Sequence, residues 1–277
     1  MQYSWLSAHL FYTGDLRLLL QHAVHPFLQQ TGHRAFFIRY WEHGQHIRLR
    51  LHIPAHTFPA VQSSLISAVK GIAGVEVQFI AYEPEIDRYG NEYSIGWAED
   101  QFVASSRYVI DVLNTTSEWS VSTALLQALK MNMALLYAWD TSPMQQLDTC
   151  RLFIRNWLPR LYDRSQPAAA QEQYFTSLLE ARFTQYAAVL LPAVHNLWEE
   201  LHAGTAATPL KQFVACNRQV FCAYATHPFD THKMQEITGS FLHMGHNRLG
   251  VSNLDEAYIM FFTLKCLQHV HARHPLS

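Results

Sequence analysis

The sequence of 277 residues is 49% hydrophobic and 15% charged, and its formal net charge is −2 with neutral histidines. This composition allows a sizeable core and excludes a disordered protein, and the balanced charge gives no case for direct binding to nucleic acid or to an acidic membrane. No apolar run approaches the roughly 20 residues that cross a bilayer. The N-terminus lacks the basic and apolar regions of a signal peptide, so a soluble, cytoplasmic protein is expected.

Neither the 17 histidines nor the four cysteines predict a metal centre. The histidines are scattered, without an HExxH sequence or paired Cys/His spacing, so we expect no metal and no cofactor. The cysteines lack CxxC spacing, and buried free thiols in a reducing cytosol are the expected state.

The first 82 residues alternate between strand-like and helix-like patterns. Their order, β-α-β-β-α-β, is the split βαβ or ferredoxin-like pattern, which yields an antiparallel sheet with both helices on one face. Pro26 is expected to disturb the first helix. In chain order the patterns predict strand 3–12, helix 16–30, strands 35–41 and 45–53 joined by a hairpin at 42–44, helix 58–72 and strand 75–82.

Beyond residue 96 almost every segment has helical character, with breaks at Pro, Gly, Asn and Ser clusters. Pro192 is expected to kink the fourth of these helices. The predicted fold is therefore α+β, with an N-terminal split βαβ antiparallel sheet over residues 1–96 and a mainly helical part over 97–277. We expect the two parts to pack as one compact unit, a single domain over 1–277. The predicted helices are 97–114, 120–139, 144–162, 168–203, 208–225, 231–247 and 253–272.

The third predicted strand, His46 to Ile53, alternates perfectly between apolar and basic side chains. Period two is typical of a half-buried strand, so Arg48 and Arg50 are expected on the same face. That face carries two guanidiniums and two imidazoles with no acid between them, and neighbouring arginines suit a carboxylate or a phosphate. The strand therefore predicts an anion site. The alternative is a solvated basic face.

Arg88 lies in a loop after the fourth predicted strand, where functional residues are common, and Gly90 allows a backbone turn beside it. The alternative is that Arg88 only pairs with Glu83, Glu85 or Asp87.

His243 is a candidate general base because the pKa of histidine lies near neutrality. It shares a helix face with Asn247, four residues later. A lone helical histidine is more often structural, but this one belongs to a chain with a predicted anion site. Glu99 is a further candidate site residue. The alternative is that it only complements the dipole of a helix N-terminus.

Together these segments resemble the C-terminal elimination domain of class I lanthipeptide (lantibiotic) dehydratases, also found in stand-alone thiopeptide-type bacteriocin biosynthesis proteins. The resemblance runs from about Trp5 to His269. Asn91 stands where the family often has a second glycine after RYG, and asparagine tolerates the left-handed turn. The matching segments are FFIRY at 36–40, HIRLR at 46–50, RYG at 88–90, an acid and a serine at Glu99 and Ser106, and HMxxNRL at 243–249.

The resemblance implies a lyase that removes glutamate from a glutamylated Ser or Thr of a ribosomally made precursor peptide. The product would be dehydroalanine or dehydrobutyrine, in lanthipeptide or thiopeptide biosynthesis. By their match to the family motifs, the implied catalytic residues are His243, Arg88, Arg50 and Arg48. The implied substrate-binding residues are Arg39, Glu99, Ser106, Asn247 and Arg248.

Full dehydratases carry a large glutamylating domain that uses glutamyl-tRNA, and this chain is too short to contain it. The resemblance therefore implies as partners a precursor peptide with its leader and a separate glutamyl-tRNA-dependent glutamylating protein. A second copy of the chain, forming a homodimer, is a further option. No direct contact with nucleic acid or membrane is expected.

Two other functions on the same scaffold stay open. Some stand-alone relatives are thiopeptide pyridine synthases, which join two dehydroalanines in a formal [4+2] cycloaddition and would not need the three arginines and the histidine. A non-catalytic precursor-binding subunit would instead have these arginines paired with carboxylates in a peptide groove. A metal hydrolase is less favoured because ligand spacing is missing.

Overall fold

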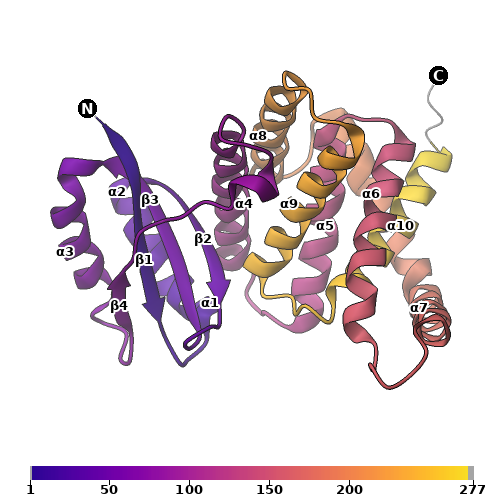
Figure 1. The fold of residues 1–277 in the computed structure, drawn as a ribbon, viewed down its shortest axis with the longest axis horizontal. Coiled ribbons are helices and arrows are strands. Elements are labelled where there is room, and N and C mark those ends of the chain that lie inside the picture. Colours follow the sequence, from indigo (N-terminus) through magenta and orange to yellow (C-terminus); the bar gives the residue numbers. More distant parts are fainter. Residues whose placement is uncertain (1, 274–277) are drawn as a thin grey trace. The chain divides into compact units, whose positions relative to one another are not determined.

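Four antiparallel strands form a sheet at the start of the computed structural model, which describes residues 2–273, and helices follow (Figure 1). The α+β class is therefore confirmed. By their contacts the described residues fall into two compact units, which meet in the sequence between Trp119 and Ser120. Helix α4, the first after the sheet, belongs to the first unit.

In the first unit the strand order is β2-β3-β1-β4, the antiparallel order of a split βαβ fold. The fourth strand ends at Phe79 rather than near Tyr82, because Tyr82 turns to pack edge-on against Trp5 and Phe36. The elements are β1 Tyr3–Phe11, α1 Leu16–Leu19, η1 Leu20–Val24, α2 His25–Thr31, β2 Arg34–Tyr40, β3 His46–Pro54, η2 Ala55–Thr57, α3 Phe58–Val69, β4 Glu76–Phe79, η3 Ile86–Tyr89 and α4 Ile95–Thr115.

The first predicted helix is disturbed at Pro26, as expected. Pro26 lies in the first turn of α2, and the preceding segment η1 widens to a π-helical turn in which the His25 N–H bonds the Leu20 carbonyl. Proline has no N–H to continue the α-helical ladder, so the widened turn precedes it.

One face of the sheet is an apolar core, covered by α2 and α3 (Figure 1). Leu10, Phe37, Leu49 and Leu51 on this face have no exposed surface. The burial of such side chains, each worth about 1.5–3 kcal/mol, fixes which face of every strand points inward.

The second unit consists of helices whose ends follow the predicted breaks. The side chains of Ser120, Ser142 and Asp230 cap three helices by accepting a backbone N–H three residues later. Gly250 ends α9 in the left-handed conformation. The helices are α5 Val121–Trp139, α6 Pro143–Trp157, η4 Leu158–Leu161, α7 Ala168–Ala203, α8 Thr208–Ala225, α9 Thr231–Leu249 and α10 Glu256–Arg273.

Helix α7 continues through Pro192 as one helix from Ala168 to Ala203. Cys150 and Cys266 are buried free thiols, as expected, but Cys216 and Cys222 are exposed because they lie on the outer side of α8.

Over residues 2–273, none of the helices has the length and hydropathy to cross a bilayer.

Candidate functional site

The polar face of the sheet brings together basic side chains from two neighbouring strands. In the β1–β3 ladder, Ser7 lies opposite Arg50 and His9 lies opposite Arg48. Because strand side chains alternate, these four residues share one face, as predicted for the two arginines. The face is not simply solvated: Arg50 and His9 are each only 6% exposed.

This face forms the floor of an open groove with a volume of about 610 Å³. Arg48, Arg50 and His9 line it, and no carboxylate oxygen within the described part of the chain lies within 4 Å of either arginine. Exposed acids stand around the groove. They are Glu42, Glu76 and Glu83.

Arg48 is held in place by its neighbours. His46 donates its Nδ1–H to the Gly44 carbonyl at 2.7 Å, so its Nε2 accepts a hydrogen bond from Arg48 Nε at 3.1 Å. The Arg48 guanidinium lies over the Tyr40 ring, 3.3 Å from its centre. These contacts fix the guanidinium at the groove without neutralising its charge.

Arg50 has two buried donors without an acceptor. Its Nε and Nη1 atoms make no hydrogen bond to any residue between 2 and 273, and its guanidinium lies 5.4 Å from the Tyr82 ring centre. Burial, together with the charge of Arg48, lowers the pKa of Arg50 to about 10, so it stays protonated at neutral pH. A buried cation with open donors favours an anionic ligand.

Ser7 and His9 add uncharged polar groups to the arginine face. Ser7 Oγ and His9 Nε2 are buried without a hydrogen-bond partner among the described residues. Burial and the charges of Arg50 and Arg48 lower the pKa of His9 to about 4, so its imidazole is neutral at pH 7.

Glu99 on α4 lies beside the Arg50 end of this face. Burial raises the pKa of Glu99, and hydrogen bonds with Trp5 and Tyr82 oppose that effect. Since Tyr82 also contacts Arg50, the structure brings Glu99 close to the predicted anion site.

Ser106, unlike Glu99, bonds the backbone of the sheet. Its buried Oγ accepts the backbone N–H of Phe37 at 3.0 Å, which occupies a donor on the edge strand β2.

Two predicted arginines do not line the groove. Arg88 forms an ion pair with Glu85 at 2.9 Å, one of the pairings considered as the alternative. Arg39 lies opposite Ile47 in the β2–β3 ladder, so it is on the face away from Arg48. Position 39 has the opposite parity on its strand from positions 36, 38 and 40, so a role of Arg39 in substrate binding stays a prediction that the groove does not support.

The second unit contains the histidine predicted as the base. His243 on α9 has Nδ1 2.9 Å from both carboxylate oxygens of Glu256, and its side chain is 16% exposed while that of Glu256 is 1% exposed. The Trp157 ring centre lies 5.0 Å from that of His243. Asn247 is half-buried on the same helix and Arg248 is fully buried.

Glu256 also contacts a second histidine. His246 places Nδ1 3.1 Å from Glu256 Oε2 and Nε2 3.1 Å from Asn132 Oδ1, and it is buried. Burial of Glu256 would raise its pKa, but the hydrogen bonds from His243 and His246 outweigh it and hold the pKa below its usual value. Glu256 is therefore a carboxylate.

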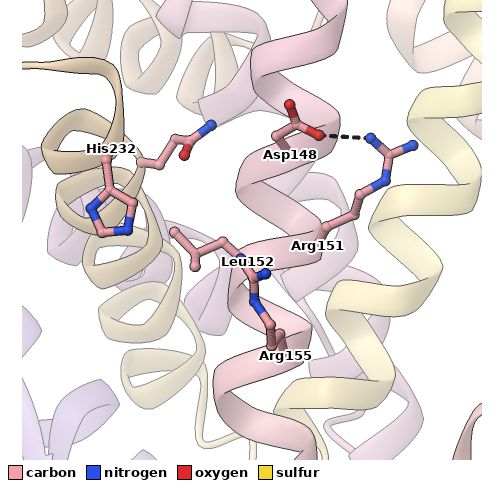
Figure 2. Close-up of a pocket in the computed structure, with 6 residues that line it drawn as sticks. Asp148, Arg151, Leu152, Arg155 and His232 are labelled. Carbon is pink, nitrogen blue, oxygen red and sulfur yellow. Dashed lines mark hydrogen bonds and ion pairs between the residues drawn. The ribbon is translucent and has the colours of Figure 1, made fainter.

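A separate pocket of about 430 Å³ lies between α6 and α9 (Figure 2). Arg151 is paired there with Asp148 at 2.7 Å, and Arg155 and His232 also line it. Among residues 2–273, no three His, Cys, Asp or Glu side chains are arranged to hold a metal ion.

Comparison with protein families gives a match over residues 5–267 to the model described as "Lantibiotic biosynthesis dehydratase C-term". The chain belongs to this family. The resemblance drawn from the sequence motifs is thereby confirmed.

Solved structures share the fold of this lantibiotic dehydratase C-terminal protein at low sequence identity. The tRNA-dependent lantibiotic dehydratase MibB from Microbispora sp. 107891 is 18% identical with a TM-score of 0.65, covering 98% of this chain and 28% of MibB. TbtD, the pyridine synthase from thiomuracin biosynthesis, is 12% identical with a TM-score of 0.66, covering 97% and 99%. TsrL is 13% identical with a TM-score of 0.68, covering 99% and 96%. A search of curated proteins found no match.

Ser7, His9, Glu256 and His246 are features of this family member that the sequence reasoning missed. The signal for the first two was the alternation Trp5-Ser7-His9 on the first strand, which places them on one face. Glu256 gave no local signal, because it reaches His243 from a different helix.

Proposed function

We propose that this member of the lantibiotic dehydratase C-terminal family eliminates glutamate from glutamylated Ser or Thr residues of a precursor peptide. The observation that carries the proposal is Arg50, buried with two open donors beside Arg48 at the floor of a groove. An anion is the ligand class that such an unneutralised pair favours.

The glutamyl adduct fits the charges of the groove. It has a free carboxylate, an ammonium group, and an ester carboxyl that gains negative charge as it leaves. Arg48 and Arg50 suit the two carboxyl groups, and the exposed acids Glu42, Glu76 and Glu83 suit the ammonium.

In the proposed reaction His243 is the base. It takes the Cα proton of the modified residue, the electron pair forms the Cα–Cβ double bond, and the Cβ–O bond breaks. That bonding pair leaves on the glutamate carboxylate, which guanidinium groups stabilise. Glu256 accepts the His243 Nδ1–H, so the ring can carry the added proton. We assign Arg88 to the same adduct, which requires it to exchange its contact with Glu85.

We further propose as partners the precursor peptide with its leader and a separate glutamyl-tRNA-dependent glutamylating protein, all acting in the cytoplasm. Substrate binding is assigned to Glu99, which lies beside the Arg50 end of the groove, and to Asn247 on the His243 helix.

A [4+2] cycloaddition is the second candidate. It is favoured by the match to TbtD, which covers nearly all of both chains. The basic groove favours elimination instead, since the dehydroalanines joined in a cycloaddition are uncharged.

The test is to incubate the purified chain with a glutamylated Ser/Thr peptide bearing its leader and to follow the mass of the peptide. Loss of one glutamic acid that requires Arg50 and His243 would support elimination. Arg164→Ala and His56→Ala are the matched controls, because both side chains are exposed and neither lines the groove or bonds His243 or Glu256. An unchanged adduct with folded protein counts against elimination, and conversion of a dehydroalanine-rich peptide would then favour cycloaddition.

A further inference from the structure

The hydrogen bonds around His243 determine where protons lie in its neighbourhood. The chain of bonds begins at Thr263, whose Oγ1 donates its single proton to the Ile259 carbonyl at 2.8 Å. Thr263 Oγ1 must therefore accept from Asn132 Nδ2, 3.0 Å away. This fixes the orientation of the Asn132 amide, so its Oδ1 faces His246 as an acceptor.

His246 consequently donates from both ring nitrogens. Its Nε2 faces an amide oxygen that can only accept, and its Nδ1 faces the carboxylate of Glu256 at 3.1 Å. Both side chains are 1% exposed, so the positive imidazolium and the negative carboxylate form a buried pair. Each charge compensates the other in a place where water does not reach either.

His243 bonds the same carboxylate. Glu256 accepts its Nδ1–H through both oxygens, so in the neutral form of the ring the lone pair lies on Nε2, the ring atom away from the carboxylate. Trp157 packs against the ring and is itself covered by the guanidinium of Arg160, 4.0 Å from the indole centre. Among the described residues, these contacts link His243 to three titratable or charged groups: Glu256 on α10, His246 on its own helix, and Arg160 beyond Trp157.

We propose that Glu256 is the positioning residue of His243, held as a carboxylate by hydrogen bonds from both His243 and His246, so that Nε2 of His243 is the basic atom. The catalytic role given to Glu256 rests on the proposed elimination, whereas the positions of the protons on the two histidines are independent of it. Asn132 keeps Nε2 of His246 protonated, because the Asn132 Oδ1 that faces it can only accept a hydrogen bond.

Two substitutions of Glu256 separate the parts of this arrangement. In Glu256→Gln the amide can donate to His246 Nδ1 and accept from His243 Nδ1, so His246 becomes neutral while the ring of His243 keeps its orientation. In Glu256→Ala the acceptor is gone, and His243 loses its preference between the two neutral tautomers. Glu236→Gln on α9, at an exposed acid near His232, is the matched control.

The deciding measurement is a long-range ¹H–¹⁵N correlation spectrum of the full chain labelled with ¹⁵N-histidine, recorded near pH 7.5. Spectra of His243→Asn and His246→Asn assign the two rings. The expected result is a proton on Nδ1 alone in His243 and on both nitrogens in His246. A neutral His246, or a proton on Nε2 of His243, would overturn the proposal, and neither result depends on the folding of a Glu256 variant.

Turnover of a glutamylated peptide gives a second readout. We expect kcat to fall on the order of 100-fold in Glu256→Ala, with KM little changed, and less in Glu256→Asp. If the wild type shows the expected spectrum but no elimination, the positioning inference stands and the proposed function fails.

Discussion

Ser7 lies directly opposite Arg50 in the β1–β3 ladder, and both carry buried polar atoms that no residue between 2 and 273 satisfies. An unsatisfied buried group costs roughly 1–3 kcal/mol, and more when it is charged. A folded protein that keeps such groups at an open groove has them ready for a ligand. Arg50 should therefore contribute more to the binding of a ligand than to the stability of the fold.

Replacing Arg50 by methionine tests this directly. The change removes a buried charge without a carboxylate partner, so we expect the free energy of unfolding to stay level or rise by about 1 kcal/mol. Binding of a glutamylated peptide should weaken at least about 10-fold, since a hydrogen bond to a charged group contributes about 1.5–3 kcal/mol. Urea unfolding and calorimetric titration measure the two quantities, with Arg164→Met as control. A loss of stability together with unchanged binding would contradict the assignment.

His9 predicts a pH dependence of stability. Its pKa is lowered from 6.5 to about 4, so between these values the unfolded chain binds more protons than the folded chain. The contribution of His9 to stability is therefore fully present above pH 6.5 and is lost as the pH falls toward 4. His9→Gln should lose less stability than the wild type between pH 7 and pH 5, as measured by urea midpoints. Parallel curves for the two proteins would show that His9 is not the group responsible.

Ser106 and Ser105 form a matched pair on α4. Ser106 Oγ accepts the buried Phe37 N–H, whereas Ser105 Oγ bonds the carbonyl of Phe102 within its own helix. Ser106→Ala removes this acceptor of a buried backbone N–H and should cost about 1–3 kcal/mol of unfolding free energy, while Ser105→Ala should change it little. Thermal or urea unfolding of both variants checks this. Equal stability of the two would mean that the Ser106 contact does not hold the strand edge.

Strict periodicity explains which parts of the molecule could be predicted from the sequence. The alternation from His46 to Ile53 predicted that Arg48 and Arg50 share a face, and the register confirms it. The same rule applied to Arg39 would have placed it on the opposite face. The contact between His243 and Glu256 joins two helices through a tertiary approach, and no local pattern specifies such a pair.

The exposed acids of the groove lead to a prediction about the ammonium group of the substrate. If elimination is the reaction, Glu42, Glu76 and Glu83 should favour a glutamyl adduct over a glutaryl adduct, which has the same carboxylate but no ammonium. Surface charge pairs contribute at most about 1 kcal/mol each, so the wild type should prefer the glutamyl peptide by several-fold in kcat/KM. Glu76→Gln should reduce that preference, and raising the salt concentration should do the same. Glu172→Gln, at an exposed acid in the other unit, is the control, and an unchanged preference in Glu76→Gln and at high salt would exclude the acids from substrate recognition.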